Sequence, residues 1–118
     1  MAVSNIPVLT SAILHIDTDI AEAAVVIKAS SAVLYELEID NTNNATAGYL
    51  KLYNAASPTV GTTAPDWIVM IPASVSRVIV IPSGLTFATA LVAACVTAGG
   101  TAGVTGPTSN VTMRAVYV

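Results

Sequence analysis

The chain has 118 residues, of which 9% are charged and 54% hydrophobic, and its formal net charge is −3. One domain of this length can bury a core without disulfide bonds, but a soluble domain usually carries roughly 25% charged residues. The acidic balance excludes a basic stripe that could neutralise nucleic-acid phosphates, and the single cysteine excludes a disulfide framework.

A weakly charged, mildly apolar surface promotes association, because large apolar patches mark interaction sites. We therefore expect either an obligate oligomer or a component of a larger assembly. No apolar run reaches the roughly 18 residues that a membrane-spanning helix requires, so we expect no membrane partner.

Residues 1–30 precede the clearest strand patterns, and we expect them to form an N-terminal segment that can extend as an arm. Within this segment, residues 20–29 fit either a short helix or a strand, and periodicity does not choose between them. Residues 31–118 are predicted to form one β-sandwich domain.

Residues 33–40 alternate as a half-buried strand does. One predicted face holds Val33, Tyr35, Leu37 and Ile39, and the other holds Leu34, Glu36, Glu38 and Asp40. After an asparagine-rich turn, residues 49–53 place Leu50 and Leu52 opposite Tyr49, Lys51 and Tyr53. The two strands are predicted to form a hairpin with a longer loop.

Residues 54–66 are rich in Ser, Thr, Pro and Gly and predict a long connection. A strand over residues 67–71 is expected to stop at Pro72, and a second over residues 77–81 to stop at Pro82. Such continuous apolar strands are typically covered on both faces, here by a second sheet or by a neighbouring subunit.

Residues 85–98 favour a strand because Thr, Val and Phe outweigh the alanines. The four glycines of residues 97–107 predict a mobile or docking loop. The last strand covers residues 110–118, with Val111, Met113, Ala115 and Tyr117 on one side. The fold class is therefore all-β, an antiparallel sandwich that is either jelly-roll-like or immunoglobulin-like.

The sequence assigns no catalytic, cofactor-binding or metal-ligating residue, and we expect no enzyme activity. His15 beside Asp17 could form a base with its orienting carboxylate, and Asp17, Asp19 and Glu22 could supply oxygen ligands to calcium. The His15 pattern is a weak signal, and the acidic cluster is more typical of a solvated acidic edge. Cys95, in an apolar run, is expected to lie in the core rather than to act as a nucleophile.

Two surface patterns keep a functional alternative. Glu36, Glu38 and Asp40 project from one strand face, and glycosidases use paired carboxylates, but rows of carboxylates on one strand more often mark a solvated face or a protected edge. The aromatic residues could form a sugar-stacking platform, although aromatics at alternating strand positions usually anchor a core or an interface. They are Tyr35, Tyr49, Tyr53, Trp67 and Tyr117.

Residues 33–118 resemble a type of small structural protein of tailed bacteriophages. In that type, a strand ending in KLYN precedes a PTVGT loop, a strand ending in IP and a Gly/Phe step. The landmarks that carry the resemblance are Lys51, Tyr53, Pro58, Thr59, Val60, Gly61, Thr62, Pro65, Ile71, Pro72, Gly84 and Phe87.

This resemblance implies a virion β-sandwich, specifically a capsid decoration or cement protein that binds as a homotrimer and bridges neighbouring capsomers. The implied partners are further copies of the chain and the major capsid protein. The implied place is the capsid exterior, after synthesis in the host cytoplasm. The alternatives are a tail, baseplate or head-fibre module, and a host-carbohydrate-binding module that uses Tyr49, Tyr53 or Trp67.

Overall fold

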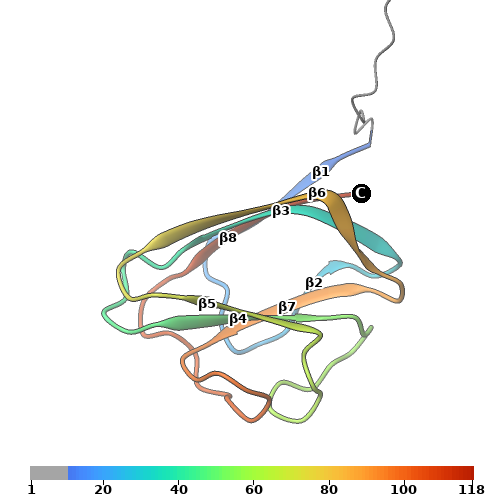
Figure 1. Cartoon of the computed structure of the whole chain (residues 1–118). Helices are drawn as coiled ribbons and strands as arrows, with labels where there is room; N and C mark the ends of the chain where they lie inside the picture. The colour runs from blue at the N-terminus through green and yellow to red at the C-terminus, as the bar shows by residue number, and fades with distance from the viewer. Residues whose placement is uncertain (1–10) are drawn as a thin grey trace, which may run out of the picture.

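The computed structural model describes residues 11–118, which form eight β-strands and no helix. The strands are β1 (Ile13–Asp17), β2 (Val25–Lys28), β3 (Ala32–Asp40), β4 (Gly48–Tyr53), β5 (Trp67–Ile71), β6 (Ser76–Phe87), β7 (Leu91–Val96) and β8 (Thr112–Tyr117). Two antiparallel four-stranded sheets pack face to face, with strand orders β1-β8-β3-β6 and β2-β7-β4-β5 (Figure 1). The predicted all-β sandwich is confirmed.

The strand order decides between the two predicted sandwich types. Each strand of the first half of the chain pairs with its counterpart from the second half: β1 with β8, β2 with β7, β3 with β6 and β4 with β5. A long two-stranded ribbon rolled up in this way is the jelly roll, whereas an immunoglobulin-like sheet would pair β1 with β2.

The core lies between the sheets and is built from one face of each strand. β8 contributes alternate residues: Met113, Ala115 and Tyr117 share one side of the strand, as predicted, and that side is buried. The other sheet contributes Leu50 and Leu52, both fully buried. The remaining large core side chains include Ile20, Leu34, Leu37, Ile39, Ile71, Phe87 and Leu91.

The predicted hairpin between residues 33–40 and 49–53 is wrong, because the two strands lie in different sheets. Their connection crosses from one sheet to the other instead of reversing within one. The buried Asn41 amide holds this crossing, since its Nδ2 donates to the carbonyls of Thr46 (3.0 Å) and Pro72 (3.1 Å). The asparagine-rich segment is a turn, as predicted. Its direction is set by the hydrogen bonds that Asn41 makes to residues distant in the chain.

Two irregularities also depart from the sequence pattern. The register of β3 shifts between Leu34 and Glu36, so Leu34 points into the core together with Leu37, although strict alternation separates them. Pro82 does not end its strand, because β6 continues to Phe87. β6 is an edge strand, where a proline need not remove a ladder hydrogen bond.

The sandwich begins before residue 31, its predicted first residue. β1 and β2 lie within residues 1–30, and they pair with β8 and β7 respectively. The ambiguous stretch of residues 20–29 contains β2, a strand, and Ile20 is buried in the core. The first ten residues of the expected arm lie outside the described residues.

Candidate interaction surface

Two rows of side chains cross the solvent side of the β1-β8-β3-β6 sheet. The register aligns Leu14, Val116, Glu36 and Val80 in one row, and Ile16, Arg114, Glu38 and Val78 in the next. The residues between them along each strand point into the core. We call these eight residues the outer face.

The outer face has an apolar border on each side. Leu14 and Ile16 on β1 are 55% and 50% exposed, and Val78 and Val80 on β6 are 58% and 63% exposed. A single exposed aliphatic residue is ordinary on a protein surface, whereas paired aliphatic residues along both edge strands of one sheet form a patch that favours contact with protein. β6 was expected to be covered on both faces, and its outer side is open in the single chain.

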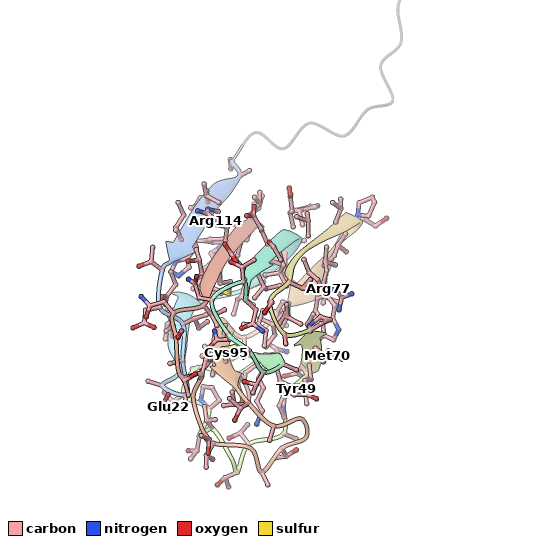
Figure 2. The ribbon with its side chains drawn as sticks, turned by 90° about the vertical axis from the view of Figure 1, so that its left-hand side faces the viewer. Glu22, Tyr49, Met70, Arg77, Cys95 and Arg114 are labelled. Carbon is pink, nitrogen blue, oxygen red and sulfur yellow. The ribbon has the colours of Figure 1, made fainter. Side chains whose placement is uncertain are left out.

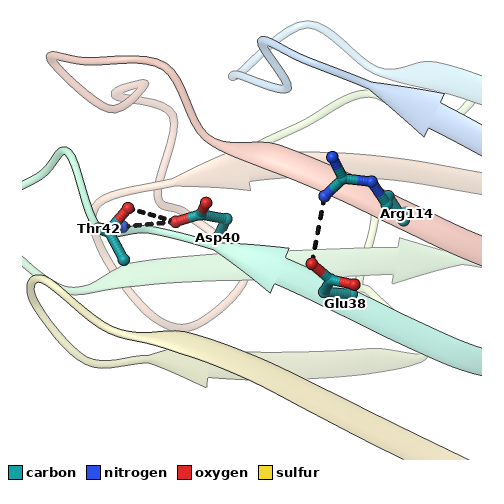
Figure 3. Close-up of polar contacts among 4 residues, drawn as sticks. All are labelled: Glu38, Asp40, Thr42 and Arg114. Atoms are coloured by element: carbon teal, nitrogen blue, oxygen red, sulfur yellow. Dashed lines mark hydrogen bonds and ion pairs between the residues drawn. The ribbon is translucent and has the colours of Figure 1, made fainter.

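Charged groups occupy the middle of the outer face. Arg114 Nη1 on β8 lies 3.2 Å from Glu38 Oε1 on β3, and both side chains are about 40% exposed (Figure 3). An ion pair at that exposure contributes at most about 1 kcal/mol to stability. Glu36 adds a second carboxylate, and Leu14 and Val116 complete a shallow depression around the three charged groups.

Asp40 lies farther along β3, where its strongest contacts are with the turn and the Arg114 charge acts on it only weakly. Its Oδ1 accepts hydrogen bonds from the hydroxyl and the backbone N–H of Thr42, which hold the Asp40 pKa below its usual value (Figure 3). The carboxylate therefore fixes the turn after β3. Glu36, Glu38 and Asp40 share a strand face, as predicted; Glu38 pairs with Arg114, and Asp40 accepts the hydrogen bonds of the turn.

No family model matches this chain, and searches of curated proteins and of solved structures found no match either. Among residues 11–118, no helix is long and apolar enough to cross a membrane.

The solvent side of the other sheet differs, because loops cover it. Lys51 and Tyr53 share a side of β4, as predicted, yet both are fully buried. Tyr53 forms a second small apolar cluster with Ala90, Val92 and Ala94, against which Val60 of the β4–β5 loop packs. Of the two sheets, the one containing β1 and β6 therefore presents the more open face.

Lys51 fastens the glycine-rich loop to the sheet. Its Nζ donates to the carbonyl oxygens of Gly103 (2.8 Å) and Thr101 (3.1 Å), and burial lowers its pKa. A second bond, from Thr97 N to Thr105 O, closes the loop on itself at 2.8 Å. The segment predicted to be a mobile or docking loop is thus tied to β4 by an ammonium group.

The Arg77 side chain covers part of the open edge of β5. Arg77, near the start of β6, donates from Nη1 to the carbonyl oxygen of Met70 at 2.6 Å, and Figure 2 shows the two side chains at the same border of the molecule. An occupied carbonyl and an adjacent cation discourage another strand from pairing there. β1, an edge strand of the other sheet, contains no lysine, arginine or proline that would discourage such pairing.

The candidate acid, base and metal residues near the N-terminus do not form a site. Within residues 11–118, no group of three His, Cys, Asp or Glu side chains is placed to hold a metal ion. Asp17 Oδ1 instead accepts the backbone N–H of Asp19 at 2.9 Å. His15 Nε2 is buried without a hydrogen-bond partner among the described residues, so no carboxylate orients it there.

Cys95 lies between the sheets, as the sequence predicted (Figure 2). Burial raises the pKa of its thiol to about 11, although a hydrogen bond with the backbone of Tyr49 acts in the opposite direction. A thiol with this pKa is almost entirely protonated at neutral pH, so it is a poor nucleophile.

The aromatic residues do not form one platform. Tyr53 is fully buried with its hydroxyl unpaired among the described residues, and the Tyr117 hydroxyl donates to the carbonyl of Ile27 at 3.3 Å. Trp67 differs, because it lines a pocket of about 210 Å³. The sequence indicated Trp67 but not the pocket, since Asp66 is its neighbour and the remaining walls, Asn54 and residues 85–87, lie at least a dozen positions away in the chain.

Proposed function

We propose that this chain is a non-enzymatic structural protein of a tailed-phage virion, a decoration or cement protein that stabilises the head by bridging neighbouring capsomers. The observation that carries the proposal is the outer face, with its two exposed apolar borders. The resemblance of residues 33–118 to small phage structural proteins and the low charge of the chain support the same role.

The arrangement of the outer face suggests how copies meet. A trimer is built from heterologous contacts, in which one surface of each copy meets a different surface of the next and the ring closes. The β6 border, Val78 and Val80, would pack on the β1 border, Leu14 and Ile16, of the neighbouring copy. Burying these four side chains at one contact removes apolar surface from water, and each Å² removed contributes about 25 cal/mol of favourable free energy.

The charged middle of the outer face fits the same assembly. Glu36 and Glu38 outnumber Arg114, so stacking two identical faces directly on each other would bring like charges together. A contact from border to border avoids that repulsion. The excess of carboxylates remains open to the capsid surface or to solvent.

Stabilisation of the shell follows from mass action. A protein that binds the assembled shell and not its dissociated subunits lowers the free energy of the shell by an amount that grows with concentration. Three linked copies also bind jointly, so weak individual contacts are sufficient.

Copy number tests this role. Quantitative mass spectrometry of purified virions of the encoding phage would compare the chain with the major capsid protein. We expect hundreds of copies in a fixed ratio to the shell subunit. A handful of copies would indicate a tail, baseplate or head-fibre module instead, and absence from the virion would contradict the proposal.

A further inference from the structure

A pocket lies where the edge strands of the two sheets approach each other, and it shares no residue with the outer face. Its volume is about 210 Å³, and its walls are Asn54, Asp66, Trp67, Leu85, Thr86 and Phe87. These residues come from the end of β4, the start of β5 and the end of β6. A pocket of this size is below the roughly 300–1,000 Å³ typical of sites for drug-sized ligands, so it suits a single small ring.

Two polar walls of the pocket are held in fixed orientations. Asn54 Oδ1 accepts the backbone N–H of Thr89 at 2.8 Å, and this bond fixes the side-chain amide so that Nδ2 faces away from Thr89. Asp66 Oδ2 accepts the backbone N–H of Asn54 at 2.7 Å. The hydrogen bonds of these two side chains among residues 11–118 use Asn54 Oδ1 and Asp66 Oδ2, so one donor, Asn54 Nδ2, and one acceptor, Asp66 Oδ1, remain available on residues that line the pocket.

The other walls add an aromatic surface and a hydroxyl group to these polar atoms. Trp67 is half-buried and contributes aromatic surface, Phe87 is buried beneath, and the Thr86 side chain is exposed and can donate or accept a hydrogen bond. A single carboxylate without a neighbouring cation disfavours an anionic ligand. A purely apolar ligand would leave the polar walls without hydrogen bonds, which is costly.

We infer that this pocket binds one pyranose ring of a carbohydrate. The apolar C–H face of the ring packs on Trp67, while two neighbouring hydroxyls bond to Asp66 Oδ1 and Asn54 Nδ2 and a third reaches Thr86. This activity goes beyond the structural role, and it would let a surface protein hold the particle on a glycan-coated cell through many weak sites.

Trp67 provides the direct readout, because it is the only tryptophan in the chain. The purified protein would be titrated with the methyl glycosides of glucose, mannose, galactose and N-acetylglucosamine, with cyclohexanol as the apolar probe. We expect a saturable change in tryptophan fluorescence at millimolar concentrations of at least one glycoside and none with cyclohexanol.

Two variants and one matched control locate the site. Asp66→Asn keeps an oxygen for the Asn54 N–H but removes the charge, and we expect affinity to fall about tenfold. Thr86→Val preserves shape and should weaken binding several-fold. Asp17→Asn is the control, because Asp17 also accepts a backbone N–H but lies on β1, away from the pocket; its affinity should equal that of the unmodified protein.

The inference is overturned if no glycoside produces a saturable change, if cyclohexanol binds equally well, or if Asp66→Asn and Thr86→Val bind as the unmodified protein does. None of these outcomes depends on the copy number in virions. Failure of the sugar site and failure of the structural role are therefore separate results.

Discussion

At the scale of single residues, burial changes what Lys51 does. Alternation places this lysine on the solvent side of β4, and nothing near it in the sequence indicates a cover. The cover comes from the glycine-rich loop some fifty residues later in the chain, whose carbonyls accept its hydrogen bonds. A buried ammonium was therefore beyond prediction, whereas the burial of Cys95 followed directly from its apolar neighbours.

Lys51→Met should release the loop. The substitution leaves the carbonyls of Thr101 and Gly103 without their donor, which costs about 1–3 kcal/mol of the free energy of unfolding. Urea denaturation measures the loss, and hydrogen exchange at the Thr97 amide should accelerate as the loop opens.

The control is Lys28→Met on β2, where the lysine is only half-buried. A surface substitution of this kind usually changes stability by less than about 0.5 kcal/mol. Equal losses in the two variants would contradict the clamping role of Lys51.

Cys95 gives the protein a pH dependence above neutrality. Its pKa is raised from 9.0 to about 11 in the folded chain, so between these values the unfolded chain loses the thiol proton first. Stability is then fully present below pH 9 and falls as the pH rises toward 11, by at most about 1.4 kcal/mol per pH unit.

Urea midpoints measured at pH 8, 9, 10 and 11 under reducing conditions, for the unmodified chain and for Cys95→Ala, isolate this contribution. Lys51 and Tyr53, whose pKa values also shift on burial, act equally in both proteins. We expect the difference in stability between the two proteins to shrink from pH 9 to pH 11. A constant difference would contradict the raised pKa.

At the scale of elements, the strands whose limits or sides follow from neighbouring residues alone were predicted well. β5 begins at Trp67 and ends before Pro72, and β8 separates its residues onto the two sides that alternation predicted. The errors arose where tertiary pairing overrides local signals. Pro82 reads as a stop, yet β6 passes through it because an edge strand tolerates proline.

Gly84 shows how tightly β6 approaches β3. Its φ is +75°, and a Cβ there would come within 2.4 Å of Val33 Cγ1 and 3.0 Å of the Tyr35 ring. Gly84→Ala should therefore lower the free energy of unfolding by roughly 1–2 kcal/mol, because alanine disfavours the left-handed backbone conformation, and by a further amount because of the steric clash.

Gly100→Ala is the matched control, because Gly100 has a similar φ of +84° but no atom within 4 Å of the added Cβ. Thermal or urea denaturation should show the larger loss for Gly84→Ala. Equal losses would mean that β3 and β6 do not pack as closely as described.

At the scale of the whole molecule, composition and turn spacing predicted a sandwich but could not order its strands. The order depends on which strands pair across the chain, such as β1 with β8, about one hundred residues apart. The same limit applies to the outer face. Leu14 and Val78 gave no signal of a shared surface until the register aligned their rows.

The outer face connects the fold to the proposed assembly. Its borders lie on opposite edge strands of one sheet, so one copy can present a different border to each of two neighbours, as a heterologous ring contact needs. A glutamate introduced at either border would bury a charge in the contact and leave the single chain folded, because all four border positions are at least half exposed.

Light scattering on the purified protein at micromolar concentration tests this assembly most directly. We predict that the unmodified chain and a Val104→Glu control, altered in the β7–β8 loop, have the mass of three chains. Val78→Glu with Val80→Glu, and separately Leu14→Glu with Ile16→Glu, should each give folded monomers. Mixing the two double variants should restore one intact contact and give a dimer. A monomeric unmodified chain, or trimers that persist in both double variants, would contradict assembly through the outer face.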